Sequence, residues 1–119
     1  MTILIASLGA GKGSWTYIIE LVKKQEWEQV MLVTNSFGAE RFSVPGRELA
    51  FVIIDDTKEI PEITQQILTQ LKGKSLGMEV ALNIVSGTGK EHMALLSSLL
   101  KLGVGIRLVG LNKETVDEL

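Results

Sequence analysis

Five short apolar runs constrain the fold of this chain more than any other feature of the sequence. They cover residues 2–6, 30–34, 49–54, 80–85 and 106–109, and segments of helical length separate them. Short runs that are apolar at nearly every position are typical of parallel strands with both faces buried. Parallel neighbours also require crossover connections, and the intervening segments are long enough to supply them. The sequence therefore predicts an α/β fold.

Apolar residues recur at helical spacing in the segments between these runs. The spacing predicts helices over residues 14–24, about 57–72 and about 90–102, with room for a short one at 39–42. Ser14 is the expected cap of the first helix, and Asp56 or Thr57 is the expected cap of the second. Residues 112–119 begin like another helix and then stop.

These elements predict a single domain over residues 1–119, with one five-stranded parallel sheet and helices on both faces. Right-handed crossovers favour the Rossmann-like strand order 3-2-1-4-5. In this order the chain reverses direction between strands 1 and 4, which leaves a crevice at their carboxyl ends. Ligands of open α/β sheets bind at such a switch point.

Charge and composition exclude several classes of function. Twelve Lys and Arg against 14 Asp and Glu give a net charge of −2, so no overall basic field draws the chain to duplex nucleic acid or to a membrane. With no Cys and one His, we expect no disulfide, no ordinary structural zinc site and no cofactor. The chain starts directly in a strand without a signal-like segment, so a cytoplasmic location is expected.

Two loops at the predicted crevice combine glycine, hydroxyl and lysine residues just before a helix. They are residues 7–14, Ser-Leu-Gly-Ala-Gly-Lys-Gly-Ser, and residues 86–90, Ser-Gly-Thr-Gly-Lys. Backbone N–H groups, a helix dipole and an ammonium group could converge on an anion there. One such loop is equally well explained as a tight turn, but two at one switch point favour a phosphate-bearing ligand.

The common nucleotide-binding signatures are absent from both loops. In a P-loop match, the first glycine position holds Ala6 in one loop and Ile84 in the other, which disfavours nucleoside triphosphate hydrolysis. The dinucleotide pattern G-x-G-x-x-G has Ser14 at its third glycine, and Asn35 follows the second strand where an acid would bind the ribose. NAD is therefore a weak candidate.

The remaining polar residues near the crevice have plain structural explanations. Asp55 and Asp56 are expected to cap a helix, because no partner cluster accompanies them in the sequence. His92 lies in the first turn of the third long helix, where the positive helix end disfavours its charged form. We expect it to be a polar edge residue or a phosphate contact more than a general base.

Residues 83–96, Asn-Ile-Val-Ser-Gly-Thr-Gly-Lys-Glu-His-Met-Ala-Leu-Leu, resemble the strand-loop-helix motif of CRISPR-associated Rossmann fold (CARF) domains. Those domains carry a Gly-Gly-Thr or Ser-Gly-Thr turn before a helix with Met and Ala near its start. The first strand with Ser7-Leu8-Gly9 is similar to their first ligand loop, and the strand–helix alternation covers essentially the whole chain. Ser86 replaces the first glycine of the commoner turn, and Gly89 separates Thr88 from Lys90 where many members place lysine directly after threonine.

The resemblance implies a homodimer that binds cyclic oligoadenylate, a second messenger of type III CRISPR defence, across its two-fold axis. Adenine contacts are assigned by position to the residues after the second strand. The expected ligand-binding residues are Ser7, Leu8, Gly9, Ala10, Gly11, Lys12, Gly13, Ser14, Asn35, Ser36, Phe37, Ser86, Gly87, Thr88, Gly89, Lys90 and His92. No metal ligand is expected among them.

Two alternatives stay open at this point. One is a metal-independent ring nuclease, in which the substrate's own 2′-OH attacks its phosphate. Lys90 or Lys12, together with a loop hydroxyl such as that of Ser7, would stabilise the developing charge. The other is a Rossmann-like interaction module without a ligand. Many members of the resembled family carry a further effector domain, so this chain is expected to be a stand-alone protein or a fragment of a longer one.

Overall fold

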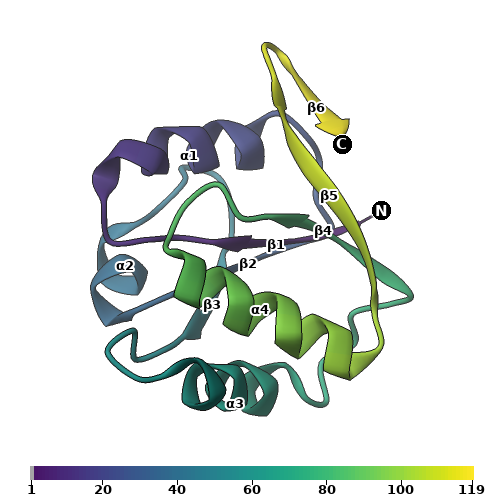
Figure 1. Cartoon of the computed structure of the whole chain (residues 1–119). Coiled ribbons are helices and arrows are strands. Elements are labelled where there is room, and N and C mark those ends of the chain that lie inside the picture. Colours follow the sequence, from purple (N-terminus) through teal and green to yellow (C-terminus); the bar gives the residue numbers. More distant parts are fainter. Residues whose placement is uncertain (1) are drawn as a thin grey trace.

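The computed structural model describes residues 2–119, apart from the side chain of Lys12, and has one six-stranded sheet in the order β3-β2-β1-β4-β5-β6 (Figure 1). The strands are β1 (Ile3–Ser7), β2 (Gln29–Thr34), β3 (Ala50–Ile53), β4 (Glu79–Asn83), β5 (Gly105–Asn112) and β6 (Thr115–Glu118). The α-helices are α1 (Trp15–Lys23), α2 (Ser36–Arg41), α3 (Ile60–Leu71) and α4 (Gly89–Leu102), and a 3-10 turn, η1 (Lys12–Ser14), precedes α1.

The predicted α/β class is confirmed, but the prediction of a purely parallel, five-stranded sheet is wrong. The five predicted strands lie in the expected sequence, and β1 to β5 pair in parallel. The tail, which was expected to begin as a helix, instead turns back at Lys113 and pairs β6 antiparallel to β5. A strand is favoured there because β5 continues to Asn112, beyond its pairing with β4, and offers a free edge.

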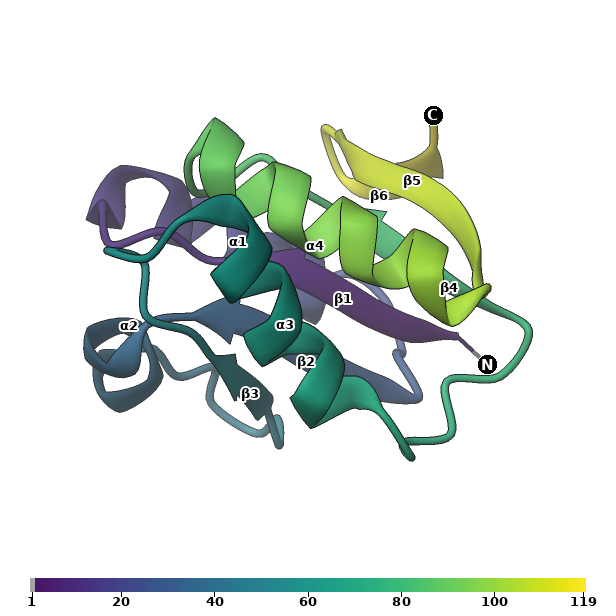
Figure 2. The same ribbon diagram turned by 60° about the horizontal axis from the view of Figure 1, so that its bottom comes forward.

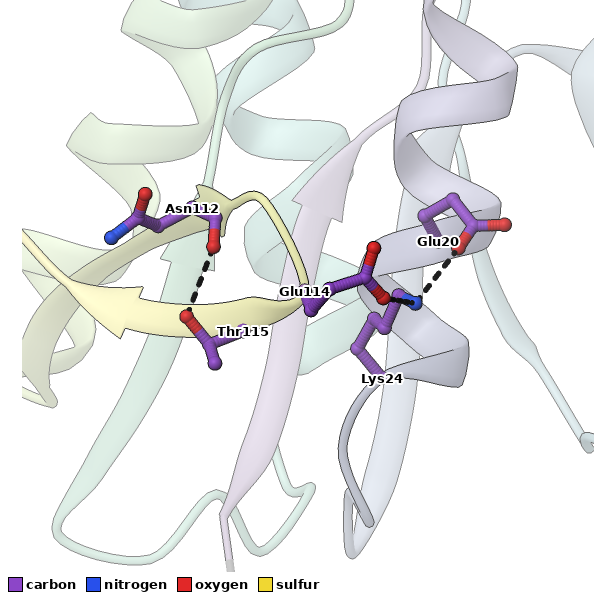
Figure 3. Close-up of polar contacts among 5 residues, drawn as sticks. All are labelled: Glu20, Lys24, Asn112, Glu114 and Thr115. Carbon is purple, nitrogen blue, oxygen red and sulfur yellow. Dashed lines mark hydrogen bonds and ion pairs between the residues drawn. The ribbon is translucent and has the colours of Figure 1, made fainter.

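The β5–β6 hairpin is tied to the C-terminal half of α1 (Figure 3). The Lys24 ammonium lies 2.8 Å from the Glu114 carboxylate and 3.7 Å from that of Glu20. The hydrogen bond and charge of Glu114 raise the pKa of Lys24, and Lys24 in turn lowers the pKa of Glu114. The Tyr17 hydroxyl also accepts a 2.8 Å hydrogen bond from the Leu111 amide. These contacts connect the added strand to the helix layer.

Helices cover both faces of the sheet, as the unbroken apolar strands predicted (Figures 1 and 2). Every residue of β1 is buried. Leu4 and Ala6 pack in the cluster that contains the α1 residues, whereas Ile3 and Ile5 pack with residues of α3 and α4. The alternation of side chains along a strand sends successive residues to opposite faces. Two cores therefore fix the central strands, and with them the loops that leave their carboxyl ends.

The helix ends follow the predictions only in part. The prediction for the third long helix is confirmed at its C-terminus, where Gly103 ends α4 with a φ of 73°. Ser14 occupies the N-cap position of α1, as predicted, but its side chain makes no capping hydrogen bond. The α3 helix begins after Glu59 rather than after Asp56 or Thr57, with Pro61 in its first turn. No helix among residues 2–119 is both long and apolar enough to cross a membrane.

Candidate functional site

The two glycine-rich loops meet at the carboxyl ends of β1 and β4, which are neighbours in the sheet. The Gly9 amide donates a 2.8 Å hydrogen bond to Ser86 Oγ. The approach is so close that a Cβ atom built on Gly9 would lie 2.8 Å from the Cα atom of Gly87. The strand order predicted that these loops flank one crevice, and the structure brings them into direct contact.

Ser86 is the residue through which the loops are connected. Its side chain is buried, with 1% exposure, and its Oγ lies 2.5 Å from that of Ser14. Its carbonyl oxygen accepts a hydrogen bond from the Ser7 hydroxyl and lies 2.8 Å from His92 Nε2. A carbonyl oxygen only accepts hydrogen bonds, so this contact requires the proton of the imidazole to be on Nε2. These bonds link β1, the start of α1 and the start of α4.

This network explains where Ser14, Ser7 and His92 differ from the predicted picture. Ser14 lies at the start of α1, but its hydroxyl contacts Ser86 instead of capping the helix. Ser7 is buried, and its hydroxyl proton is directed to the Ser86 carbonyl. His92 is half-buried and contacts the same carbonyl. All three side chains therefore contact Ser86 and stabilise the junction of the two loops.

The glycines of the two loops have two different structural roles. Gly9 is needed because Gly87 leaves no space for a side chain. Gly87 itself has a φ of +100°, and a Cβ there would lie 2.6 Å from Glu91 Oε1. By contrast, Cβ atoms built on Gly11, Gly13 and Gly89 meet nothing within 4 Å. The first pair holds the loops together, whereas the open glycines leave their backbone accessible.

A hollow of about 440 Å³ lies between the loops. Its lining comes from both loops and from the segment after β3: Gly9, Ala10, Gly11, Gly13, Ser14, Asp56, Val85, Gly87, Thr88 and Glu91. The volume is within the range of small-molecule sites. The start of α4 borders it, where Thr88 and Glu91 form a reciprocal capping box. The hollow thus combines accessible backbone, hydroxyl groups and a helix N-terminus.

The charged side chains that the structure describes in the lining of the hollow are acidic. The carboxylates of Asp56 and Glu91 belong to its lining. Lys90 is half-buried at the start of α4 and is not part of the described lining. Its charge instead adds to the lowering of the Asp55 pKa, which is caused mainly by hydrogen bonds from Thr57. The side chain of Lys12, the other predicted phosphate contact, lies outside the described residues.

Of the residues after β2 that were predicted by position to contact a base, only Asn35 is hydrogen-bonded to a lining residue of the hollow. Asn35 accepts a 2.9 Å hydrogen bond from the Gly38 amide and so caps α2. Its Nδ2 donates a 3.1 Å hydrogen bond to Asp56 Oδ2. Ser36 is exposed, and the exposed Phe37 packs near Trp15. Of the predicted residues in this segment, Asn35 is the one connected to the hollow lining.

Leu8, which was predicted to contact the ligand, is instead a core residue. Its side chain is 2% exposed and belongs to the core beneath α1. Three lining residues were not predicted as ligand contacts: Asp56, Val85 and Glu91. The signal for Asp56 is its position shortly after the third strand, at the same sheet edge as both loops. The signal for Glu91 was its place three residues after Thr88, the spacing of a capping box.

The side chains described in residues 2–119 include no group of three or more His, Asp or Glu that could hold a metal ion. No protein-family model matches the chain, and no curated protein matches it either.

Proposed function

We propose that this chain is a sensor module that binds cyclic oligoadenylate, with the ligand received between the loops after β1 and β4. The observation that carries the proposal is the hollow itself, which lies at the switch point of the sheet and is bounded by two loops joined through Ser86 and Gly9. Open α/β sheets bind nucleotides at this position.

The chemistry of the loops supports a nucleotide ligand. Gly11, Gly13 and Gly89 leave backbone amides approachable, and backbone N–H groups bind phosphate oxygens well. The α4 helix adds the positive end of its dipole, and Lys90 adds a full charge beside it. We expect phosphates to lie near Lys90, at the edge of the hollow.

The resemblance of residues 83–96 to the CARF motif narrows the ligand to a cyclic oligoadenylate and suggests a role in type III CRISPR defence. Those residues form the end of β4, the second loop and the first half of α4. They include Ser86 and Thr88, which fix the loop, and Gly87, whose backbone conformation favours glycine.

Two considerations support a homodimer. A hollow of about 440 Å³ suits one nucleotide-sized group, whereas a ring of four or six nucleotides is much larger. A two-fold axis would present two hollows to one ring with a repeated structure. The outward face of α4 is also unusually apolar, with Met93 at 58% and Leu100 at 65% exposure. A second copy of the chain would remove these side chains from water.

Calorimetric titration with cyclic tetra-adenylate and cyclic hexa-adenylate tests the proposal. We expect Lys90→Ala to weaken binding about tenfold to a hundredfold, the usual effect of losing a charge-assisted contact. Lys72→Ala, at the C-terminal end of α3, is the matched control and should bind like the wild type. Chromatography of the recovered ligand separates binding from cleavage: intact rings support the sensor, and linear products would support the ring nuclease. Wild-type protein that binds neither ring would contradict the proposal.

A further inference from the structure

The two carboxylates in the lining of the hollow influence which part of a nucleotide can lie beside them. Asp56 and Glu91 line it, whereas no lysine or arginine is found among the lining residues that the structure describes. Like charges at close range repel, and more strongly where water is partly excluded. Next to these two carboxylates a phosphate group is therefore disfavoured, and a neutral group that donates hydrogen bonds is favoured.

The Asp56 carboxylate is held in a defined orientation. Asn35 is fixed by its bond to the Gly38 amide, and it donates to Asp56 Oδ2 at 3.1 Å. Asp56 is half-buried, and its second oxygen, Oδ1, takes part in none of the hydrogen bonds found within residues 2–119. A carboxylate with one oxygen occupied and one open is a suitable acceptor for a single ligand donor.

Glu91 differs from Asp56 because its carboxylate is already in use. Glu91 Oε1 accepts a 3.0 Å hydrogen bond from the Thr88 amide and so supports the second loop. Its charge still faces the hollow, but its hydrogen-bonding role is structural. Asp56 is therefore better placed than Glu91 to accept a hydrogen bond from the ligand.

We infer that Asp56 selects the ligand by accepting a hydrogen bond from a nucleoside, so that a nucleoside lies beside this residue and the phosphates lie away from it. This inference rests on the proposed function. Two donors of an adenosine unit have the required chemistry, namely the exocyclic amine of the base and the ribose 2′-hydroxyl. Both groups are neutral, and for each there is an analogue that lacks it: the inosinate ring lacks the amine, and the 2′-deoxy ring lacks the hydroxyl.

The substitution Asp56→Asn gives this inference a directional test. Because Asn35 donates to position Oδ2, an asparagine at residue 56 would keep its carbonyl oxygen toward Asn35 and turn its amide nitrogen toward the hollow. An acceptor would thereby become a donor while the shape stays the same. Hypoxanthine carries an acceptor oxygen where adenine carries its amine, so the variant should prefer the opposite base.

The experiment titrates the full chain with cyclic tetra-adenylate, cyclic tetra-inosinate and the 2′-deoxy form of the adenylate ring. We expect the wild type to bind tetra-adenylate at least about tenfold more tightly than one of the two analogues, the size expected for a lost hydrogen bond to a charged group. In Asp56→Asn that preference should disappear or reverse. Asp55→Asn is the matched control, because Asp55 bonds Thr57 and does not line the hollow.

The three rings separate the possible outcomes. If Asp56→Asn no longer discriminates against the inosinate ring, Asp56 contacts the amine of the base. If the variant no longer discriminates against the deoxy ring, Asp56 contacts the ribose 2′-hydroxyl. If Asp56→Asn binds all three rings with the same preferences as the wild type, this inference is wrong and the proposed function is unaffected. Failure of the wild type to bind any ring would overturn the proposed function and this inference with it. Thermal melting of each variant checks that it is folded.

Discussion

Gly9 and Gly87 lie backbone against backbone, so that a Cβ atom on Gly9 would come within 2.8 Å of Gly87 Cα. The two residues belong to loops that are distant in sequence and adjacent in the sheet. We predict that Gly9→Ala lowers the free energy of unfolding by about 1–3 kcal/mol, because the backbone of Gly87 cannot move aside as a flexible side chain would. Urea denaturation measures this change.

Gly11→Ala is the control for that substitution. It lies in the same loop, but a Cβ there meets nothing within 4 Å. Its free energy of unfolding should stay within about 0.5 kcal/mol of the wild type. Equal effects of the two substitutions would show that the contact between the loops contributes nothing to stability.

We predict that Ser86→Ala destabilises the fold by about 1–3 kcal/mol, because it leaves the amide of Gly9 without its buried acceptor. It also removes the contact with the Ser14 hydroxyl. Ser97→Ala, on the outer side of α4, should change stability by less than about 0.5 kcal/mol. Thermal and urea unfolding of the two variants compare them, and a Ser86 variant as stable as the wild type would contradict the role given to this residue.

The Asp55 carboxyl provides a pH-dependent test. Hydrogen bonds from the Thr57 hydroxyl and amide lower its pKa, and the charges of Lys58 and Lys90 add to the effect. Because the pKa of Asp55 is lower in the folded state, its carboxylate stabilises the fold, and this contribution is fully present well above the unfolded-state pKa of about 3.9. It is lost as the pH falls through the folded-state value. Thr57→Val should move the pKa of Asp55 upward in a carboxyl NMR titration, and an unchanged pKa would contradict this cause.

The apolar face of α4 gives a prediction for assembly. Leu100→Glu places a charge where we expect the second copy to pack, and it should convert the dimer to a monomer in light scattering at micromolar concentration. The exposure of Leu100, 65%, means that the monomer itself should remain folded. Thr69→Glu, on the exposed side of α3, is the control and should leave the dimer intact. A wild-type protein that is monomeric with and without ligand would contradict the proposed assembly.

Features encoded by local sequence were the ones predicted well. β1 was found because Ile3 to Ala6 are apolar without interruption, the pattern of a strand buried on both faces. The end of α4 was found because Gly103 adopts the left-handed conformation that commonly ends helices. The position of both loops followed from the strand order, since the switch point is a property of topology.

Features that depend on distant partners were missed. β6 exists because β5 offers a free edge, and no local pattern in the short tail reveals that edge. Ser14 has the right type for a helix cap, but a tertiary contact with Ser86 takes its hydroxyl instead. Asp56 was interpreted as a cap because its partner Asn35 lies 21 residues away. Short-range rules cannot anticipate such competition between local and tertiary hydrogen bonds.

Native mass spectrometry of the protein mixed with cyclic tetra-adenylate and with cyclic hexa-adenylate tests the central claim most directly, because one spectrum reports both binding and assembly. We predict a dominant complex of two chains with one intact ring for at least one of the two rings. Linear tetra-adenylate at the same concentration should give no such complex. Spectra that contain only ligand-free chains, or single chains that bind linear and cyclic forms alike, would contradict the account.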